Sequence, residues 1–386
     1  MLRYLNAGES HGRCLMAVLE GVPAGLPLTA EDIDVDLVRR QGGYGRGGRM
    51  RIEKDRIEFS CGVRKGKTLG NPLGLTIENK DWKNWVDIMA AEPGPPVTER
   101  VVTRPRPGHA DLVGAIKYGH RDIRNVLEKA SARETAIRVA IGGVAKALLA
   151  QFDMRVVSYT TEIGRVKAPI AADPLSAYEQ AELSQVRCHD SVAGDKMIEL
   201  IRSAKHKGDS LGGVFEVVVT NPPIGLGTYA QWDRRLTARL AMAAMSIQAM
   251  KGVEIGMGFE AARSFGSEVH DDIYPGDEGQ TFLRKTNNAG GLEGGITNGQ
   301  SIVLRVAMKP IATLYSPKHS VDIQTKEPFE ATVERSDICT VPAAGVVGEA
   351  VIAFEMANVM VEKFGGDTLE EMKRNFDAYQ EYVKSF

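Results

Sequence analysis

The sequence has few of the residues on which several common kinds of protein chemistry depend. It contains four cysteines in 386 residues, and none of them forms a C-x-x-C pair: Cys14, Cys61, Cys188 and Cys339. Such wide spacing disfavours a zinc ribbon and a disulfide scaffold, so we expect reduced thiols. The metalloprotease pattern H-E-x-x-H and the hydrolase pattern G-x-S-x-G are absent as well. The sequence therefore predicts neither a metal site nor a serine nucleophile.

An excess of one charge and long apolar runs are also missing. Lys and Arg number 48 against 50 Asp and Glu, which gives a formal net charge of -2. Proteins that coat nucleic acid or an anionic membrane usually carry a strong positive excess, so we expect neither partner. The first residues become polar too early for a secretory signal, and no run of 18 apolar residues occurs. We expect a cytoplasmic protein without a membrane segment.

Glycine is abundant, with 41 residues set between helical and strand-like segments. The longest helical periodicity runs from about 122 to 152, while the β-branched runs at 214–220 and 301–308 are typical of strands. Helices and strands do not alternate regularly, which favours an α+β fold over a doubly wound parallel sheet. No low-complexity linker divides the chain, so we expect one domain over residues 1–386.

Two parts of the sequence resemble each other weakly. GVPAGLP at 21 and NPPIGLG at 221 each precede a helical pattern, then a glycine-rich turn and a strand. KTLGNPLGLTIEN and GGITNGQSIVLRV correspond to each other further along. This pattern is consistent with an internal pseudo-repeat, although turn residues also recur by chance.

The segment RRQGGYGRGGRMR at 39–51 contains the pattern G-x-G-x-x-G. A dinucleotide fingerprint needs these glycines after a strand and before a helix. Here they follow an expected helix, which begins with a Thr29–Asp32 capping box and has Ile33, Leu37 and Val38 on its apolar side. The five arginines suggest an anion clamp instead, because a guanidinium holds carboxylate or phosphate through two hydrogen bonds. A solvated basic loop and an RNA-binding Arg/Gly box are alternatives.

Two of the seven histidines lie among glycines, His11 in AGESHGR and His109 in RPRPGHADL. Histidine exchanges protons near neutral pH, and a neighbouring glycine lets a ligand approach the backbone. Both are therefore candidates for acid catalysis. A structural histidine is the alternative for either residue alone.

Eight blocks taken together and in order resemble the chorismate synthase family, from one end of the chain to the other: GESHG, RRQGGYGRGGRM, RPGHAD, SARETAIRVAIGG, IQAMKGVEIGMGFE, NNAGGLEGGITNGQ, KPIAT and ERSD. The resemblance implies a redox-neutral lyase of the shikimate pathway that uses reduced FMN. Its reaction would be the anti-1,4-elimination of phosphate and the C6 hydrogen from 5-enolpyruvylshikimate 3-phosphate, giving chorismate. The implied fold is a helical layer sandwiched between antiparallel β-sheets, assembled as a homotetramer.

The resemblance also implies roles for individual residues. His11 would protonate the departing phosphate, His109 would lie at the flavin N1/C2 carbonyl region, and Asp337 near N5 would relay the proton from C6. Substrate binding is implied for Arg40, Arg46, Arg49, Arg106 and Arg335. Flavin contacts are implied for Lys129, Ala130, Ser131, Gln248, Ala249, Gly294, Lys309, Thr313 and Arg335. Lys129-Ala130 stands where many members have Arg-Ser, which would weaken flavin binding, and NADPH is a possible reductant of the flavin.

Overall fold

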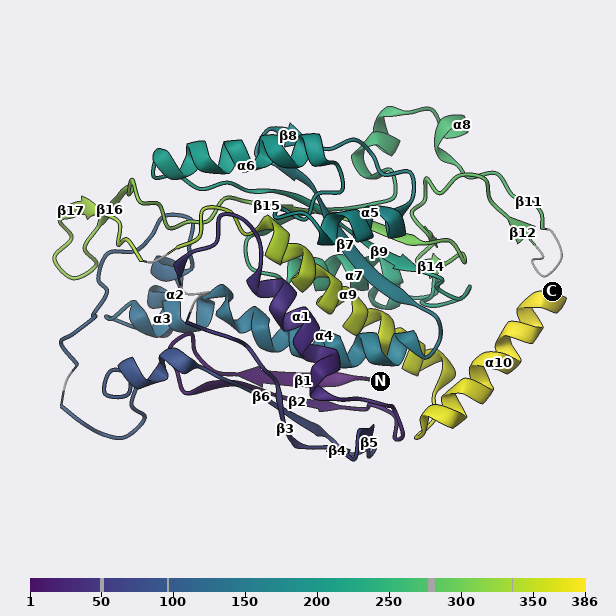
Figure 1. Cartoon of the computed structure of the whole chain (residues 1–386), viewed down its shortest axis with the longest axis horizontal. Coiled ribbons are helices and arrows are strands. Elements are labelled where there is room, and N and C mark those ends of the chain that lie inside the picture. Colours follow the sequence, from purple (N-terminus) through teal and green to yellow (C-terminus); the bar gives the residue numbers. More distant parts are fainter. Residues whose placement is uncertain (49–51, 96, 277–281, 335) are drawn as a thin grey trace.

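A layer of helices lies between two antiparallel sheets in the computed structural model, which describes residues 1–48, 52–95, 97–276, 282–334 and 336–386 (Figure 1). The first sheet has the order β1-β2-β6-β3, with β1 (Arg3–Ala7), β2 (Cys14–Glu20), β6 (Leu73–Glu78) and β3 (Glu58–Cys61). The second has the order β10-β15-β9-β7-β8, with β10 (Met250–Ile255), β15 (Ile302–Met308), β9 (Gly213–Thr220), β7 (Arg155–Ile163) and β8 (Val166–Lys167). The α+β sandwich expected from the family resemblance is confirmed.

Three helices form the central layer: α1 (Ala30–Gln41), α4 (Thr135–Ala150) and α9 (Val341–Phe364). α4 packs on β2 and β6 of the first sheet, and α9 packs on β7 and β9 of the second. The two helices pack closely against each other, since a Cβ placed on Gly142 would lie 2.3 Å from the Cβ of Ala350. Small residues therefore let both helices bury nearly their whole surface.

The other helices and the short strands surround these layers. The helices are α2 (Asp111–Tyr118), α3 (Arg124–Ala130), α5 (Pro174–Glu182), α6 (Ser191–His206), α7 (Leu236–Met245), α8 (Gly266–Val269) and α10 (Leu369–Ser385). Single 3-10 turns are Lys80–Asn84, Ala132–Glu134, Trp232–Arg234 and Gly258–Arg263. The two-stranded pairs are β4 (Val63–Arg64) with β5 (Lys67–Thr68), β11 (Tyr274–Pro275) with β12 (Phe282–Leu283), β13 (Leu292–Glu293) with β14 (Ile296–Thr297), and β16 (His319–Val321) with β17 (Pro328–Glu330).

α9 is long and apolar enough to cross a membrane by length and composition, with a mean hydropathy of 1.6 in its most apolar 18-residue window. However, 94% of that window is buried inside the protein. Its apolar surface is covered by α4, β7 and β9. α9 is therefore accounted for as the central core helix of the sandwich.

α1 begins as the sequence predicts. The Thr29 N–H donates to the Asp32 carboxylate at 2.8 Å, which confirms the capping box. Ile33 and Leu37 are fully buried, but the prediction for Val38 was wrong, because 60% of Val38 is exposed. The buried face of α1 turns toward Asp34 and Arg40, which are polar and nearly inaccessible to solvent. Long-range polar contacts therefore decide which side of this helix faces inward.

The long helical segment expected at about 122–152 is in fact two helices. α3 ends at Ala130, and Ser131 is extended, with ψ of 141°. The Ser131 hydroxyl accepts the Arg133 N–H at 3.2 Å, so it caps the turn that leads into α4. This local hydrogen bond competes with continuation of the helix and so explains the break. The spacing of apolar residues continues through Ser131 and therefore does not reveal it.

The two sheets have the same strand order when each half of the chain is followed separately. The order β1-β2-β6-β3 in the first half corresponds to β7-β9-β15-β10 in the second. In each half, a short strand pair comes directly before the strand that is third in this sheet order. The pair β4–β5 comes before β6, and the pair β13–β14 comes before β15. This correspondence supports the internal repeat expected from the sequence.

A matching threonine in each half makes the same hydrogen bonds. The Thr68 hydroxyl donates to Pro23 O at 2.6 Å, and the Thr297 hydroxyl donates to Pro223 O at 2.6 Å. Each hydroxyl also accepts the N–H three residues after that proline, at 3.0 and 2.8 Å. The weak sequence similarity of the two turns thus reflects one shared local structure.

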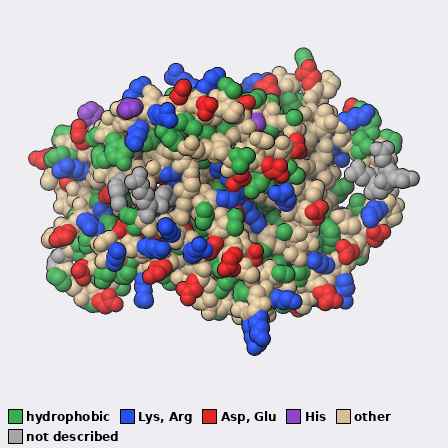
Figure 2. All heavy atoms as spheres, viewed as in Figure 1, with side chains coloured by type: hydrophobic (Ala, Val, Ile, Leu, Met, Phe, Trp, Pro, Cys, Tyr) green, Lys and Arg blue, Asp and Glu red, His purple; other side chains and the backbone are tan. Residues whose placement is uncertain are grey.

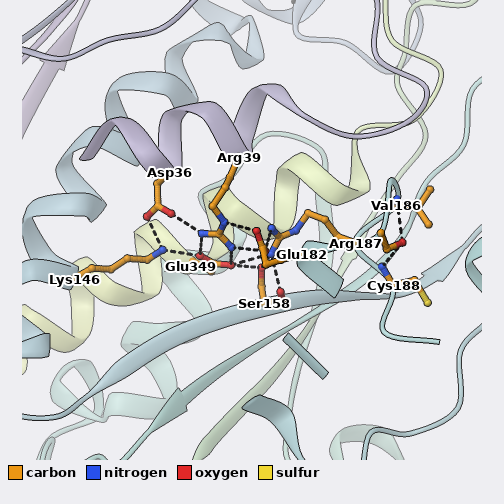
Figure 3. A network of polar contacts seen from close by, with 10 residues as sticks. Asp36, Arg39, Lys146, Ser158, Glu182, Val186, Arg187, Cys188 and Glu349 are labelled. Carbon is orange, nitrogen blue, oxygen red and sulfur yellow. Dashed lines mark hydrogen bonds and ion pairs between the residues drawn. The ribbon is translucent and has the colours of Figure 1, made fainter. Parts of the chain in front are cut away.

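A network of charged side chains crosses the helical layer around Glu349, which is fully buried in α9 (Figure 3). Arg39 from α1 and Lys146 from α4 both reach this carboxylate, at 2.7 and 2.6 Å. The other members are Asp36, Ser158, Glu182 and Arg187. Burial alone would raise the pKa of Glu349, but Lys146 and Arg39 hold it well below its ordinary value. The network ties the last turn of α1 to the core, directly before Arg40.

Candidate active site

The turn between β1 and β2 holds His11 at one edge of the first sheet. Its main-chain N–H donates to Glu128 Oε2 at 2.8 Å, and its Nδ1 lies 2.9 Å from Glu128 Oε1. The imidazole stacks on Trp85, with ring centroids 3.9 Å apart and an interplanar angle of 18°. The His11 side chain is 12% exposed. Two residues distant in sequence therefore hold the histidine that the sequence indicated.

Glu128 is a buried carboxylate with several donors around it. Its side chain is 1% exposed, and it also accepts from Arg124 Nη1 at 3.0 Å. Burial would raise the pKa of Glu128, but hydrogen bonds from His11 and Arg124 lower it overall. The carboxylate next to His11 is therefore ionised at neutral pH.

Arg40, in the last turn of α1, points into the interior near this turn. It donates from Nε to the Thr135 hydroxyl at 2.9 Å and from Nη2 to Ala132 O at 3.0 Å, and its Nη1 lies 3.4 Å from Asp55. Asp55 is shared with Arg133, whose Nη1 is 2.6 Å away. Burial lowers the pKa of Arg40 to about 9, with Asp55 opposing this shift and Arg133 adding to it. A buried cation of this kind gains stability when an anion binds beside it.

The glycine-rich segment after α1 packs against residues 336–339. Arg46 Nη1 lies 3.0 Å from Asp337 Oδ2, and the Gly47 N–H donates to Asp337 Oδ1 at 2.5 Å. The Ile338 N–H donates to Gly45 O at 2.8 Å, and Gly45 has φ of +91°, a conformation that favours glycine. Within residues 42–48 these glycines follow a helix and not a strand, which is not the context of a dinucleotide-binding turn.

A second polar group surrounds the start of α2. Arg106 donates from Nε to Asp111 at 2.8 Å and from Nη1 to the Thr313 hydroxyl at 3.0 Å. His109 Nδ1 lies 2.5 Å from Asp111 Oδ1. Asp111 is fully buried, and burial would raise its pKa, but the hydrogen bonds from His109 and Arg106 hold it well below its ordinary value. Each candidate histidine thus has a buried carboxylate at its Nδ1.

Lys309 extends this second group. Its Nζ donates to Gly108 O at 2.8 Å, and its main-chain N–H donates to Ala249 O at 3.0 Å. Burial and the neighbouring charge of Lys251 lower the pKa of Lys309. A surface pocket of about 460 Å³ opens beside Lys309 and Ala312. The place is suited to an anionic group, which would compensate the two lysine charges.

A third group lies at the break between α3 and α4. Gln248 Nε2 donates to Glu134 at 2.8 Å, and Glu134 also accepts from Asn6 at 2.6 Å. The Glu134 N–H donates to Ser131 O at 3.3 Å, so Glu134 contacts both Ser131 and Gln248. Within the described part of the chain, Gln248 Oε1 is buried and has no hydrogen-bond partner. Such an acceptor is costly unless a ligand donates to it.

Described residues on both sides of position 335, at 332–334 and 336–337, contact these groups. The Thr332 hydroxyl donates to Arg104 O at 2.9 Å, next to the second group. Glu334 lies 3.2 Å from Arg124, whose other nitrogen holds Glu128. Asp337 contacts Arg46, so residues close together in sequence contact the surroundings of His11, the glycine-rich segment and the neighbourhood of Arg106.

Arg49 and Arg335 lie outside the described residues. Gly294 is exposed in the turn between β13 and β14, and no described contact joins it to the other expected residues. Lys129 and Ala130 lie at the end of α3, directly before Ser131, and the other described residues expected at the site take part in the contacts given above.

The turn with His11 has a counterpart in the second half of the chain. GESHG at 8–12 leads into β2, and GDSLG at 208–212 leads into β9. Leu211 occupies the position of His11, so the second copy lacks a proton donor there. Of the two matching turns, the one in the first half of the chain carries the candidate acid histidine.

Several site residues were missed by the sequence analysis. Asp111 follows His109 by two residues, so its spacing could have indicated the pair. Glu128, Trp85 and Asp55 gave no such signal, because each reaches the site through tertiary packing. Among the described residues, no group of three or more His, Cys, Asp or Glu side chains is arranged to hold a metal ion. Figure 2 shows Lys and Arg mixed with Asp and Glu over the visible face, in keeping with the balanced net charge.

Comparisons with known proteins agree on one family. The chorismate synthase family model matches residues 2–361. A curated chorismate synthase from Geobacter metallireducens is 58% identical over 395 aligned positions, covering 100% of both chains. One from Desulforamulus reducens is 57% identical with the same coverage. A crystal structure of chorismate synthase has a TM-score of 0.81 and 45% identity, over 100% of this chain and 99% of that one.

Proposed function

Because the chain belongs to the chorismate synthase family and is a carbon-oxygen lyase of shikimate-pathway aromatic biosynthesis, we propose that it converts 5-enolpyruvylshikimate 3-phosphate to chorismate. The C3–O and C6–H bonds break on opposite sides of the ring, and a second ring double bond forms. Phosphate and a proton leave, so the elimination involves no net oxidation or reduction. Neither an RNA-binding protein nor a nicotinamide oxidoreductase fits this family.

The substrate carries a phosphate and two carboxylates, which the arginines would hold. Arg40 supports this assignment most strongly, because its pKa is lowered to about 9 by burial and a nearby anion would relieve that destabilisation. Arg46 and Arg106 would add directional donors. Arg49 and Arg335 complete the proposed set. Closure of the glycine-rich segment over the ligand would exclude water and strengthen each charge contact.

The two histidines would act as proton donors at different points. With Nδ1 directed to Glu128, His11 has Nε2 left to give a proton to the departing phosphate oxygen. His109, with Asp111 at its Nδ1, would donate toward the N1/C2 carbonyl region of the flavin. Asp337, paired with Arg46, would lie near the flavin N5 and relay the proton that N5 would accept from C6. An acid at the leaving group and a base on the far side suit an anti elimination.

The third group fits reduced FMN as the cofactor. The buried Gln248 Oε1 provides an acceptor for an imide N–H, and the site near Lys309 and Lys251 favours an anionic part of the ligand. When bound, reduced FMN would supply an electron-rich ring with a basic N5 beside the substrate. The residues proposed to hold it are Lys129, Ala130, Ser131, Gln248, Ala249, Gly294, Lys309, Thr313 and Arg335. Ala130 brings no hydroxyl, so affinity would be lower than with serine.

The observation that carries this function is the pairing of each candidate histidine with a buried carboxylate, at 2.9 Å for His11 and 2.5 Å for His109. The test is an anaerobic assay with 5-enolpyruvylshikimate 3-phosphate and chemically reduced FMN, in which chorismate and phosphate are followed together. Oxidised FMN is the control, and oxidised FMN with NADPH shows whether the protein reduces its own flavin.

Equal amounts of chorismate and phosphate that depend on reduced FMN are the expected result. His11→Asn and His109→Asn should each lower kcat by about 10²- to 10⁴-fold. Equal phosphate release with oxidised FMN, or full activity in both variants, would overturn the proposal.

We also propose a cytoplasmic homotetramer built from single-domain chains. One hydrophobic core extends across both sheets and the helices between them, which supports one domain over residues 1–386. The outer face of the first sheet exposes Leu5, Met16 and Val18, and such a face supports association with another copy. Light scattering should give four times the chain mass of 41.9 kDa.

A further inference from the structure

We propose that Glu128 is a positioning residue that fixes the orientation and tautomer of the His11 imidazole. The inference rests on the proposed function, in which His11 donates a proton from Nε2. Glu128 lies in α3, 117 positions beyond His11, and no family motif used above includes it.

The first argument is geometric. The Glu128 carboxylate binds the His11 ring at Nδ1, at 2.9 and 3.0 Å from its two oxygens, and also binds the His11 main-chain N–H at 2.8 Å. The Glu128 carbonyl accepts the Ser10 N–H at 2.9 Å. One residue therefore fixes the backbone of the turn and the side chain that it presents.

The second argument concerns the ring face. Trp85 stacks on the His11 imidazole, and Arg100 lies over the same indole at 4.1 Å from its ring centroid. Rotating the imidazole by half a turn would place Cδ2 at the Glu128 carboxylate and lose the hydrogen bond. The stacked Trp85 keeps the ring plane, and Glu128 selects one of the two orientations within that plane.

The chemical consequence follows from the acceptor character of an ionised carboxylate. Glu128 can only accept, so the His11 proton that it holds stays on Nδ1. In the neutral ring Nε2, the nitrogen that faces away from Glu128, then carries a lone pair, and in the protonated ring its proton is the one that can pass to the phosphate. The charged groups that surround this pair are Glu128 and Arg124 of α3, Arg100 above Trp85, Glu334 beside Arg124, and Glu9 in the same turn.

Glu128→Gln keeps the size of the side chain but cannot satisfy its donors. Two carboxylate oxygens now accept from His11 N–H, His11 Nδ1 and Arg124, whereas an amide offers one oxygen and a donating NH2 group. If the NH2 group faces Nδ1, that nitrogen must accept and the proton moves to Nε2. If the NH2 group faces the His11 main-chain N–H, two hydrogen-bond donors point at each other and the turn between β1 and β2 must shift.

The test combines kinetics with magic-angle-spinning NMR of protein labelled with ¹⁵N-histidine, in which His11→Asn identifies the His11 signal. We expect Glu128→Gln to lower kcat by about 10²- to 10⁴-fold with KM changed by less than about threefold. The NMR signal should change from the Nδ1–H tautomer to a population with Nε2–H. Glu128→Asp, which keeps the charge, should recover at least a tenth of the wild-type kcat.

Glu355→Gln is the matched control, because Glu355 is also a buried glutamate paired with an arginine, Arg239, away from this site. It should lose stability without changing kcat or the His11 signal. An unchanged His11 tautomer in Glu128→Gln would overturn the inference. If Glu128→Gln changes the His11 tautomer but His11→Asn keeps full activity, Glu128 still positions the ring. The proposed acid role of His11 is then overturned.

Discussion

Arg46 and Asp337 form an ion pair of 3.0 Å between Nη1 and Oδ2, although they lie in the first and last quarters of the chain. The Gly47 N–H donates to the same carboxylate at 2.5 Å. One acidic residue therefore contacts both a side chain and the backbone of the glycine-rich segment. Substrate binding and proton transfer depend on this contact under the proposed function.

Asp337→Asn tests the acidic residue itself. Asparagine can still accept the Gly47 N–H, so the segment should stay in place, but the proton relay and the charge partner of Arg46 are lost. We expect kcat to fall by about 10²- to 10⁴-fold, measured in the anaerobic assay. Asp173→Asn, at the N-cap of α5, is the control, since asparagine also caps helices. Equal kcat values for Asp337→Asn and the wild type would contradict the relay role.

The close approach of the glycine-rich segment to Ser336 can be tested by replacing each of two neighbouring glycines with alanine. A Cβ on Gly47 would lie 2.9 Å from Ser336 O, while a Cβ on Gly48 would meet nothing within 4 Å. Gly47→Ala should push the segment away and lower kcat/KM by about 10²-fold, as expected for a displacement near 1 Å. Gly48→Ala should leave kcat/KM unchanged. The idea fails if both variants behave alike.

Arg40→Gln tests the buried cation. Because the pKa of Arg40 is lowered to about 9, the folded protein disfavours its charged form, and this cost is present at every pH below 9. Without ligand, the variant should therefore lose little stability. Substrate at about 100 times its Kd should stabilise the wild type by about 2.7 kcal/mol and the variant by much less, measured by thermal denaturation. Arg56→Gln, which removes an exposed guanidinium, should keep the full ligand effect.

Asp111→Asn tests the carboxylate behind His109 through its pH dependence. The pKa of Asp111 lies below its unfolded value of about 3.9, so its contribution to stability is present above that pH and is lost as pH falls through the folded pKa. At pH 7 the variant should be less stable by about 3–5 kcal/mol in urea denaturation. The difference from the wild type should stay constant down to about pH 4 and then shrink. A difference that grows on acidification would contradict the ion-pair account.

Local features of the fold could be predicted from the sequence because their causes are local. The capping box of Thr29 and Asp32 joins residues three positions apart, and β-branched runs identified β9 and β15. The repeated turns around Pro23 and Pro223 were visible for the same reason, since each turn makes its hydrogen bonds from similar residues. The order of eight motifs was sufficient to recognise the family.

The break at Ser131 and the exposure of Val38 were not predictable from periodicity. An apolar pattern continues through Ser131, while the hydroxyl that ends α3 there competes with the helix through a single hydrogen bond. Val38 fits an apolar stripe, but the polar contacts of Asp34 and Arg40 rotate the helix away from it. Apolar periodicity is a property of several residues together, whereas a single hydrogen bond or buried polar contact acts at one residue.

The sequence by itself determined the family, the helical and strand segments and the two histidines with their glycine neighbours. Only the tertiary structure decided which acids accompany His11 and Arg46, because Glu128 and Asp337 are more than 100 positions away from them in the sequence. Burial makes these contacts important for stability, because a buried charge is stable only beside hydrogen-bond donors or an opposite charge. Neither burial nor such a long-range pairing is encoded in the spacing of neighbouring residues.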